Sequence, residues 1–361
     1  MIRTLSAGVS ALLLCLSLCL SLVAVSAPAQ AQTERDSFQV CWSIYVGWIP
    51  WDYGDTQGIV DKWADKYDIS IDVVQINDYI ESINQYTAGQ YDGCTMTNMD
   101  ALTIPAAGGV DSTALIVGDF SDGNDGIVLK NNDSLADIEG QKVNLVELSV
   151  SHYLLARALE SVGLSERDID VENTSDADLV AAYQTDDVTA VATWNPLLST
   201  LTAQPDANPV FDSSQIPGEI IDLMVVNTDT LKANPALGKA LTGAWYEIMA
   251  TMHGDDDAGK KARAYMGEVA GTDRAGFERQ LDATRMFYQA ADALAFVNSE
   301  QLKTTMQRVA EFSFQHGLLG AGAPDAGFVG VQTPSGVYGL NSNIQLRFDP
   351  AYMQMAADGD L

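Results

Sequence analysis

Acidic and aromatic side chains recur in this sequence just after short apolar runs of the kind that form buried strands. Carboxylates accept the N–H groups of a small polar solute, and indole rings stack on a planar one. Because open α/β sheets bind ligands beyond the carboxyl ends of their strands, this placement predicts a binding cleft. The candidate site residues are Trp48, Trp51, Asp52, Asn98, Asp100, Glu147, Ser149, Trp194, Asn195, Glu219 and Asp222.

Each of these loops also has a purely structural interpretation. Asn98, Ser149 and Asn195 are residue types that cap helix N-termini, and a tryptophan in a loop can simply pack against the core. A single loop therefore does not decide between the two interpretations. The recurrence of such residues at the same end of successive strands favours the cleft.

Motifs for catalysis or metal binding are absent from the sequence. It has neither the G-x-S-x-G nucleophile turn nor the G-x-x-x-x-G-K-[ST] phosphate loop. Asp122 and Asp125 resemble part of a calcium loop, but Gly126 stands where the third acidic ligand belongs, so we interpret the segment as a solvated turn. The histidines, at positions 152, 253 and 316, have no zinc-site spacing. We expect no enzyme, no metal and no cofactor.

The composition excludes several classes of partner. The 361 residues are 47% hydrophobic, which is enough for one large or two medium domains, and they carry a net charge of −30. A surface this acidic repels nucleic acid and anionic lipid alike. A small anion held by local dipoles is still compatible with it, so charge alone does not choose the ligand.

The N-terminus is typical of a secretory signal peptide. Residues 1–31 contain one basic residue, Arg3, then an apolar run over 11–25, and end on a small-x-small cleavage site at Ala31. The run is too short for a bilayer-spanning helix, and no later run is long enough either. We expect cleavage and a soluble, monomeric, periplasmic protein.

Cleavage would leave Cys41 and Cys94 as the remaining cysteines. Two thiols in an oxidising compartment can pair. Both lie in apolar runs that predict buried strands, where a small thiol is an ordinary core residue, and the geometry of a disulfide is narrow. We therefore favour unpaired thiols.

Hydrophobic periodicity predicts two α/β domains followed by helices. Strand-like and helix-like runs alternate from 38 to 118 and again from 142 to 192, with a turn-rich stretch at 119–126 between them. An apolar strand is expected over 220–226, and helices over 235–252, 277–296 and 299–316. The tail from Gly317 is Gly-rich and is expected to be irregular until about Tyr352.

Four segments carry a resemblance to a known family: Cys41–Trp51, Gly93–Asp100, Ala192–Pro196 and Ser214–Glu219. They resemble the nitrate/taurine-type substrate-binding proteins of ABC importers, and within these the branch linked to urea carboxylase. The resemblance implies a two-lobed periplasmic-binding-protein fold (type II clamshell), with crossings near 124–128 and 218–223 and extra C-terminal helices. Lobe 1 would comprise 32–126 and 220–361, and lobe 2 would comprise 127–219. An ABC permease and its ATPase are the implied partners.

The branch implies guanidine, or urea, as the ligand, and the candidate residues favour guanidinium. Asp100, Glu147, Glu219 and Asp222 would pair with its N–H groups, while Trp48, Trp51 and Trp194 would stack on its faces. No candidate residue is a Lys or Arg that would neutralise an anion. Another small solute of the nitrate/taurine class, or a role as a ligand sensor for a membrane receptor, remains an alternative.

Overall fold

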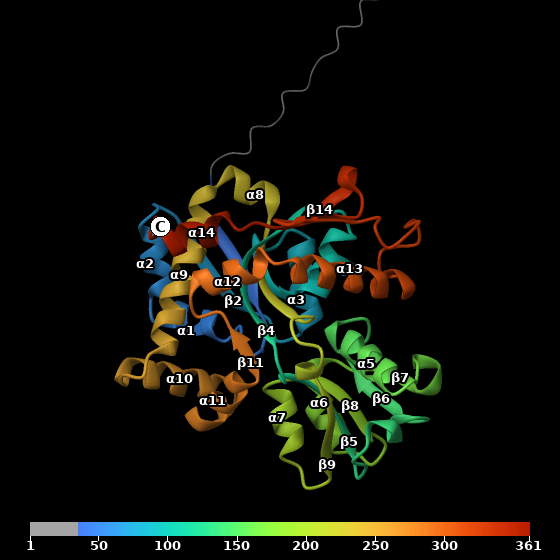
Figure 1. Cartoon of the computed structure of the whole chain (residues 1–361). Helices are drawn as coiled ribbons and strands as arrows, with labels where there is room; N and C mark the ends of the chain where they lie inside the picture. Colours follow the sequence, from blue (N-terminus) through green and yellow to red (C-terminus); the bar gives the residue numbers. More distant parts are fainter. Residues whose placement is uncertain (1–34) are drawn as a thin grey trace, which may run out of the picture. The chain divides into compact units, whose positions relative to one another are not determined.

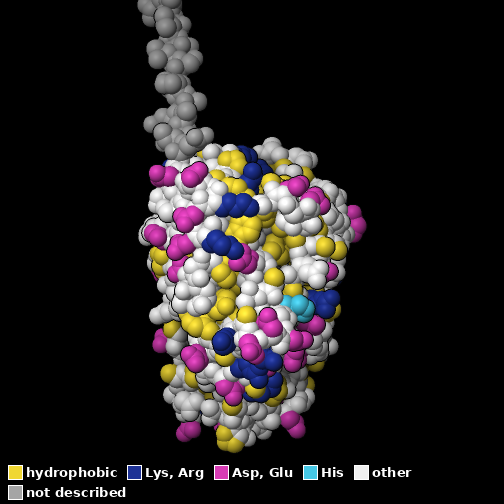
Figure 2. Space-filling view, turned by 90° about the vertical axis from the view of Figure 1, so that its left-hand side faces the viewer, with side chains coloured by type: hydrophobic (Ala, Val, Ile, Leu, Met, Phe, Trp, Pro, Cys, Tyr) yellow, Lys and Arg dark blue, Asp and Glu magenta, His cyan; other side chains and the backbone are white. Residues whose placement is uncertain are grey.

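The computed structural model describes residues 35–361, so the expected signal peptide lies outside the described residues. Among the residues it describes, no helix has the length and apolarity needed to cross a membrane. On the face that Figure 2 presents, acidic side chains are scattered over the surface rather than gathered in one patch.

The larger of two sheets has nine strands in the order β13-β12-β14-β4-β10-β3-β1-β2, with β11 paired to β4. Strands β2, β1 and β3 run parallel, whereas β10 lies antiparallel between β3 and β4. The strands are β1 (Ser37–Trp42), β2 (Ser70–Gln75), β3 (Gly93–Thr97), β4 (Ser112–Ser121), β10 (Ile221–Asn227), β11 (Thr284–Met286), β12 (Gly330–Thr333), β13 (Gly336–Tyr338) and β14 (Ile344–Phe348).

The smaller sheet has five strands in the order β7-β6-β8-β5-β9 (Figure 1, green). They are β5 (Asp125–Lys130), β6 (Lys142–Leu145), β7 (Asp170–Asn173), β8 (Ala190–Trp194) and β9 (Ala207–Asp212). The chain leaves the larger sheet at the end of β4, enters the smaller one at β5, and returns between β9 and β10. We call the part built on the larger sheet lobe 1 and the part built on the smaller sheet lobe 2; their exact boundaries stay a prediction.

Helices cover both sheets, and those of the last third of the chain belong to the larger one (Figure 1). They are α1 (Pro50–Thr56), α2 (Ile59–Asp65), α3 (Tyr79–Thr87), α4 (Asn98–Ala101), α5 (Val150–Ser161), α6 (Asp176–Tyr183), α7 (Leu197–Thr202), α8 (Thr228–Ala233), α9 (Pro235–His253), α10 (Asp257–Val269), α11 (Arg274–Asp282), α12 (Ala290–Val297), α13 (Glu300–Gln315) and α14 (Ala351–Asp358). Short turns of tighter or wider helix include η1 (Leu102–Ala106) and η3 (Glu166–Asp168).

Three expectations about local structure are wrong. The helix expected over 277–296 is interrupted because Thr284–Met286 pair with β4 as β11. The tail after Gly317 contributes β12, β13 and β14, and β14 extends the larger sheet beside β4. The expected loop around Trp51 is helix α1, because Pro50 sits at the first helical position, where its missing N–H costs nothing.

The thiols of Cys41 and Cys94 are joined in a disulfide, contrary to our expectation of unpaired cysteines. Strands β1 and β3 are parallel neighbours, and their register places the two residues directly opposite each other, with their Cα atoms 4.4 Å apart. Both side chains are completely buried. The bridge therefore joins the two strands from whose ends the first two candidate loops emerge.

Removing this bridge should destabilise the protein without altering the loops. We expect Cys41→Ala/Cys94→Ala to lower the free energy of unfolding by about 2–4 kcal/mol, because the unfolded chain gains freedom between the cysteines. Thermal unfolding is the appropriate measurement, since guanidinium and urea are themselves candidate ligands. Alkylation of two free thiols in the denatured, unreduced protein would contradict the pairing.

Candidate functional site

A small buried cavity lies where the two lobes meet. Its empty space measures ≈ 240 Å³, but the centre of a water molecule has only ≈ 10 Å³ of it to occupy, about enough for one water. The lining residues are Tyr45, Trp48, Tyr79, Thr97, Asp125, Val150, Trp194, Ile220 and Asp222. A ligand of several non-hydrogen atoms would therefore require the walls of this cavity to move apart.

Four aromatic rings, each in contact with the next, form one wall of the cavity. The ring centroids of Tyr45 and Trp48 lie 4.9 Å apart, those of Trp48 and Tyr79 5.4 Å, and those of Tyr79 and Trp194 5.6 Å. The first two residues follow β1, Tyr79 begins α3, and Trp194 ends β8 in the other sheet. Because the row includes residues from both lobes, it is complete only when the lobes are in contact.

Direct hydrogen bonds between the lobes hold the cavity closed. The indole N–H of Trp194 donates to the carbonyl oxygen of Ile44 at 3.1 Å. The Val46 amide donates to the Asn195 carbonyl at 3.3 Å. The structure is therefore the closed form of the clamshell.

Two pairs of aspartates lie at or behind the cavity wall. Asp125 and Asp222 line it, and both are 2% exposed. Asp119 stands directly opposite Asp222 across the β4–β10 pairing, and it accepts a hydrogen bond from the Tyr45 hydroxyl at 2.9 Å. Asp100 accepts from the hydroxyls of Tyr79 at 2.6 Å and Thr97 at 2.9 Å. We call Asp100, Asp119, Asp125 and Asp222 the aspartate quartet.

Burial makes these carboxyls unusually hard to ionise. Loss of hydration raises the pKa of Asp119 and of Asp125 to about 7, and the pKa of Asp100 to about 6. Desolvation, together with the nearby charges of Asp119 and Asp125, raises the pKa of Asp222 well above its usual value. None of the described residues lining the cavity is Lys, Arg or His. Any negative charge on these carboxyls therefore has no counterion in the described cavity lining.

Several polar atoms around the cavity have no hydrogen-bond partner. One oxygen each of Asp100, Asp119 and Asp222 is buried and receives no N–H or O–H from the described residues, and the indole nitrogen of Trp48 is unpaired; Asp119 and Asp222 can pair with each other only when one of them is protonated. Buried acceptors left unpaired cost free energy, of the order of 1–3 kcal/mol each. Of these three acids, Asp222 lines the cavity, so its free oxygen is the one that a ligand with N–H donors and positive charge would meet directly.

The helix end nearest the cavity is not free to bind an anion. Val150 begins α5 and lines the cavity, and helix N-termini often hold anionic ligands. Here the backbone N–H of Val150 lies near the Asp100 carboxyl and, after the hydroxyls of Tyr79 and Thr97, partly offsets the effect of burial on the pKa of Asp100. A protein carboxylate thus stands where a sulfonate or nitrate would otherwise bind.

The structure brings only part of the predicted site set together. Trp48, Trp194 and Asp222 line the cavity, and Asp100 lies one hydrogen bond behind Tyr79. The others lie outside its lining. Trp51 stacks on Trp245 in the core, Asp52 accepts a hydrogen bond from the Tyr265 hydroxyl, and Glu147 is exposed. Ser149 caps α5, and Asn195 accepts a hydrogen bond from the Ser199 amide of α7. Asn98 donates to the Glu219 carbonyl, and the Glu219 carboxylate pairs with Arg157 and Arg308.

Four members of the aromatic row and the aspartate quartet were missed from sequence. Tyr45 and Tyr79 were assigned to a strand and a helix start, and Asp119 and Asp125 to the turn between domains. For the two acids the sequence did contain a usable indication, because Asp119 and Asp125 lie where the chain first passes between the lobes. Spacing did not reveal it, because strand register decides which turn residues face inward.

Two characterised relatives match part of the sequence. The taurine-binding periplasmic protein of Escherichia coli is 26% identical over 117 residues, which is 32% of this chain and 36% of that protein. An aliphatic sulfonates-binding protein of the same organism, whose assignment is provisional, is 36% identical over 83 residues, or 23% of this chain and 26% of that protein. The chain thus matches well under half the length of either relative.

A solved structure matches nearly the whole described chain. The periplasmic aliphatic sulphonate binding protein of Escherichia coli superposes with a TM-score of 0.65 at 19% identity, over 79% of this chain and 94% of that one. This likeness confirms the predicted two-lobed α/β periplasmic-binding-protein fold. The model of the NMT1-like family matches residues 42–266, more than half of the sequence. The chain therefore belongs to the NMT1-like family.

Proposed function

We propose that this protein is a periplasmic solute-binding protein that captures guanidinium between its lobes and delivers it to an ABC importer. The observation that carries the proposal is the cavity, which combines a row of four aromatic rings with Asp125 and Asp222 and has no basic residue among the described residues of its lining. Family membership and the periplasmic relatives support the transport role, in which a permease and its ATPase receive the solute.

Guanidinium matches the chemistry of the residues that line this cavity. It is a small planar cation whose polar groups are all N–H donors, so it pairs with carboxylates and stacks on aromatic faces. At the effective dielectric of real protein sites, a cation about 4 Å from one carboxylate gains about 4 kcal/mol of Coulomb energy before desolvation is counted. That attraction opposes the cost of ionising Asp125 and Asp222 in a buried place.

Anions and urea match the cavity less well. A sulfonate or nitrate would meet the quartet and find no cationic side chain, and the α5 N-terminus already faces Asp100. Urea is similar in shape to guanidinium, but it carries an acceptor oxygen and no charge. It would leave carboxylates either unpaired or protonated, and both states cost free energy.

A ligand panel tests the proposal directly. We expect guanidinium to raise the melting temperature and to bind in calorimetry, with urea weaker and nitrate and taurine inactive. At a concentration 100 times its dissociation constant, the bound ligand should stabilise the protein by about 2.7 kcal/mol. Stabilisation by nitrate or taurine with no response to guanidinium would overturn the assignment.

Neutralising single acids distinguishes binding by the cavity carboxyls from a general effect of the acidic surface. We expect Asp125→Asn and Asp222→Asn each to weaken guanidinium binding about tenfold to a hundredfold, because each removes a charge-assisted hydrogen bond of about 1.5–3 kcal/mol. Glu147→Gln is the matched control, since Glu147 is exposed and lies outside the cavity lining. Equal losses in all three variants, measured by calorimetry, would exclude the aspartates as specific partners.

The raised pKa values predict how binding depends on pH. Below about pH 7, Asp119 and Asp125 take up protons, so guanidinium affinity should fall by roughly tenfold per pH unit for each carboxyl that must ionise. Urea affinity should change little between pH 8 and 5. The stability of the ligand-free protein should depend on pH in the opposite direction. Because the raised pKa values let the folded chain hold more protons than the unfolded chain, its free energy of unfolding should fall as pH rises from about 4 to 7. A guanidinium affinity that is flat over this range would contradict the model.

A further inference from the structure

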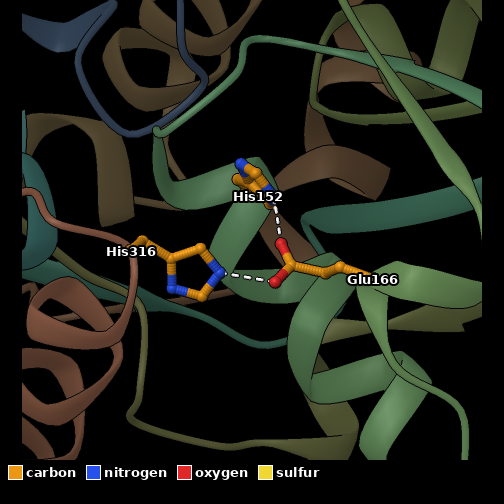
Figure 3. Close-up of side chains that lie close together, drawn as sticks. All are labelled: His152, Glu166 and His316. Carbon is orange, nitrogen blue, oxygen red and sulfur yellow. Dashed lines mark hydrogen bonds and ion pairs between the residues drawn. The ribbon is translucent and has the colours of Figure 1, made fainter.

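Two histidines and a glutamate converge at a second place between the lobes, outside the cavity (Figure 3). His152 comes from α5 and Glu166 from η3, both in lobe 2, while His316 ends α13 in lobe 1. One ligating atom from each residue lies within 4.8 Å of the others. Both imidazole Nε2 atoms point at the same carboxylate, at 2.5 Å for His316.

The hydrogen bonds around the cluster orient its rings. The Nδ1 atom of His316 donates to the Phe312 carbonyl at 2.9 Å, and its ring stacks on Phe312 at a centroid distance of 4.0 Å. A backbone carbonyl on Nδ1 is the usual second partner of a histidine whose Nε2 binds a metal. The Nδ1 of His152 accepts the Leu148 amide N–H at 3.0 Å, so in this structure its Nε2 carries a proton.

The surroundings allow an ion to enter. Glu166 and His316 line an open groove of ≈ 480 Å³ between α5 and α13, whereas the His152 side chain is 5% exposed and lies behind them. The cluster thus has one closed side and one side open to solvent. Three protein ligands with an open position match zinc sites that keep a water as the fourth ligand.

We propose that His152, Glu166 and His316 bind a divalent transition-metal ion of the Zn²⁺ class. The ion would take the lone pair of each Nε2 and one carboxylate oxygen, with water completing a four-coordinate shell. Its bonds of about 2.0–2.2 Å require the three ligand atoms to spread slightly from their metal-free contacts.

Protons balance as the ion enters. His316 gives up its Nε2 proton to solvent and keeps the one on Nδ1. His152 transfers its proton from Nε2 to Nδ1, which releases the Leu148 amide. The Leu148 N–H, whose bond to His152 is part-buried, would then need a water as its partner. Hard cations such as Mg²⁺ and Ca²⁺ prefer all-oxygen sites and should not bind here.

The positions of the three metal ligands imply that the ion would link the two lobes. Two ligands belong to lobe 2 and one to lobe 1, so the metal would bridge the lobes next to the ion pairs between Glu219 and Arg157 and Arg308. No residue of the aspartate quartet takes part. The proposal is therefore independent of the identity of the solute.

The test is Zn²⁺ binding by the chain purified without a histidine tag and stripped of metal, in competition with a chromophoric chelator. We expect one equivalent to bind to the wild type, and about tenfold to a hundredfold weaker binding for His316→Gln and Glu166→Gln. His253→Gln is the matched control, since His253 is an exposed histidine at the end of α9. Mg²⁺ should not compete.

Cobalt substitution tests the site by visible absorption in the wild-type protein, so the result does not depend on whether a variant folds. Co²⁺ in this site should give the visible absorption bands of a four- or five-coordinate ion with nitrogen ligands, and Zn²⁺ should remove them. Octahedral Co²⁺ bands, Zn²⁺ affinity equal in the wild type and His316→Gln, or loss of binding in His253→Gln instead would each overturn the proposal.

Discussion

The constraint on which this structure depends is the burial of four carboxyl groups around one small cavity with no counterion in its lining. Asp119 and Asp222 face each other across paired strands at the centre of the larger sheet, so their separation is fixed by strand register. Asp125 begins the first strand of the other lobe. When ionised, Asp125 repels Asp119 and Asp222 of lobe 1, and the raised pKa of Asp222 reflects burial first and this repulsion second.

Other contacts must hold the lobes together against that repulsion. Hydrogen bonds from Trp194 and Val46 cross between the lobes beside the cavity. Farther out, Glu219 receives the hydroxyl of Tyr153 at 2.5 Å and the guanidinium group of Arg157 at 2.9 Å, both from α5, and pairs with Arg308 of α13. This buried acid is fully compensated, unlike the quartet. Ion pairs at the rim thus stabilise closure while the centre is left with unsatisfied charge for a ligand.

The sequence predicts the site only as far as local pattern reaches. Trp48, Trp194 and Asp222 were identified because they follow or begin strands, and that property is local. Asp125 lies in an Asp/Gly-rich stretch whose composition is that of a turn, and only pairing with β8 and β9 turns it into a buried strand start. Glu147 was chosen for its place before a helix, yet the loop turns it to solvent. Whether a given residue faces the cavity therefore depends on how the strands pair, which local sequence does not specify.

Long-range pairing explains the remaining differences from prediction. The Cys41–Cys94 disulfide depends on β1 and β3 being neighbours, which apolar runs do not specify. Glu166 and His316 are 150 residues apart, so no spacing motif connects them. In the same way, β11 interrupts an apparently continuous helical pattern because β4 offers it a free edge. Periodicity recovered the alternation of strands and helices in both α/β parts, since alternation is local, whereas the two-lobed fold came from the family resemblance. The residues that face one another across the lobes are set by topology.

The net charge and the cavity act on a cation at different ranges. A net charge of −30 raises the concentration of cations near the surface, but salt screens this effect beyond about 10 Å. It also favours Na⁺ and K⁺ as much as any organic cation. Inside the closed cavity screening is weak, and discrimination depends on stacking against Tyr45, Trp48, Tyr79 and Trp194 and on N–H donors directed at the free aspartate oxygens. A spherical alkali ion supplies neither, so under the proposed function the aromatic row, rather than the acidity, would make the site selective.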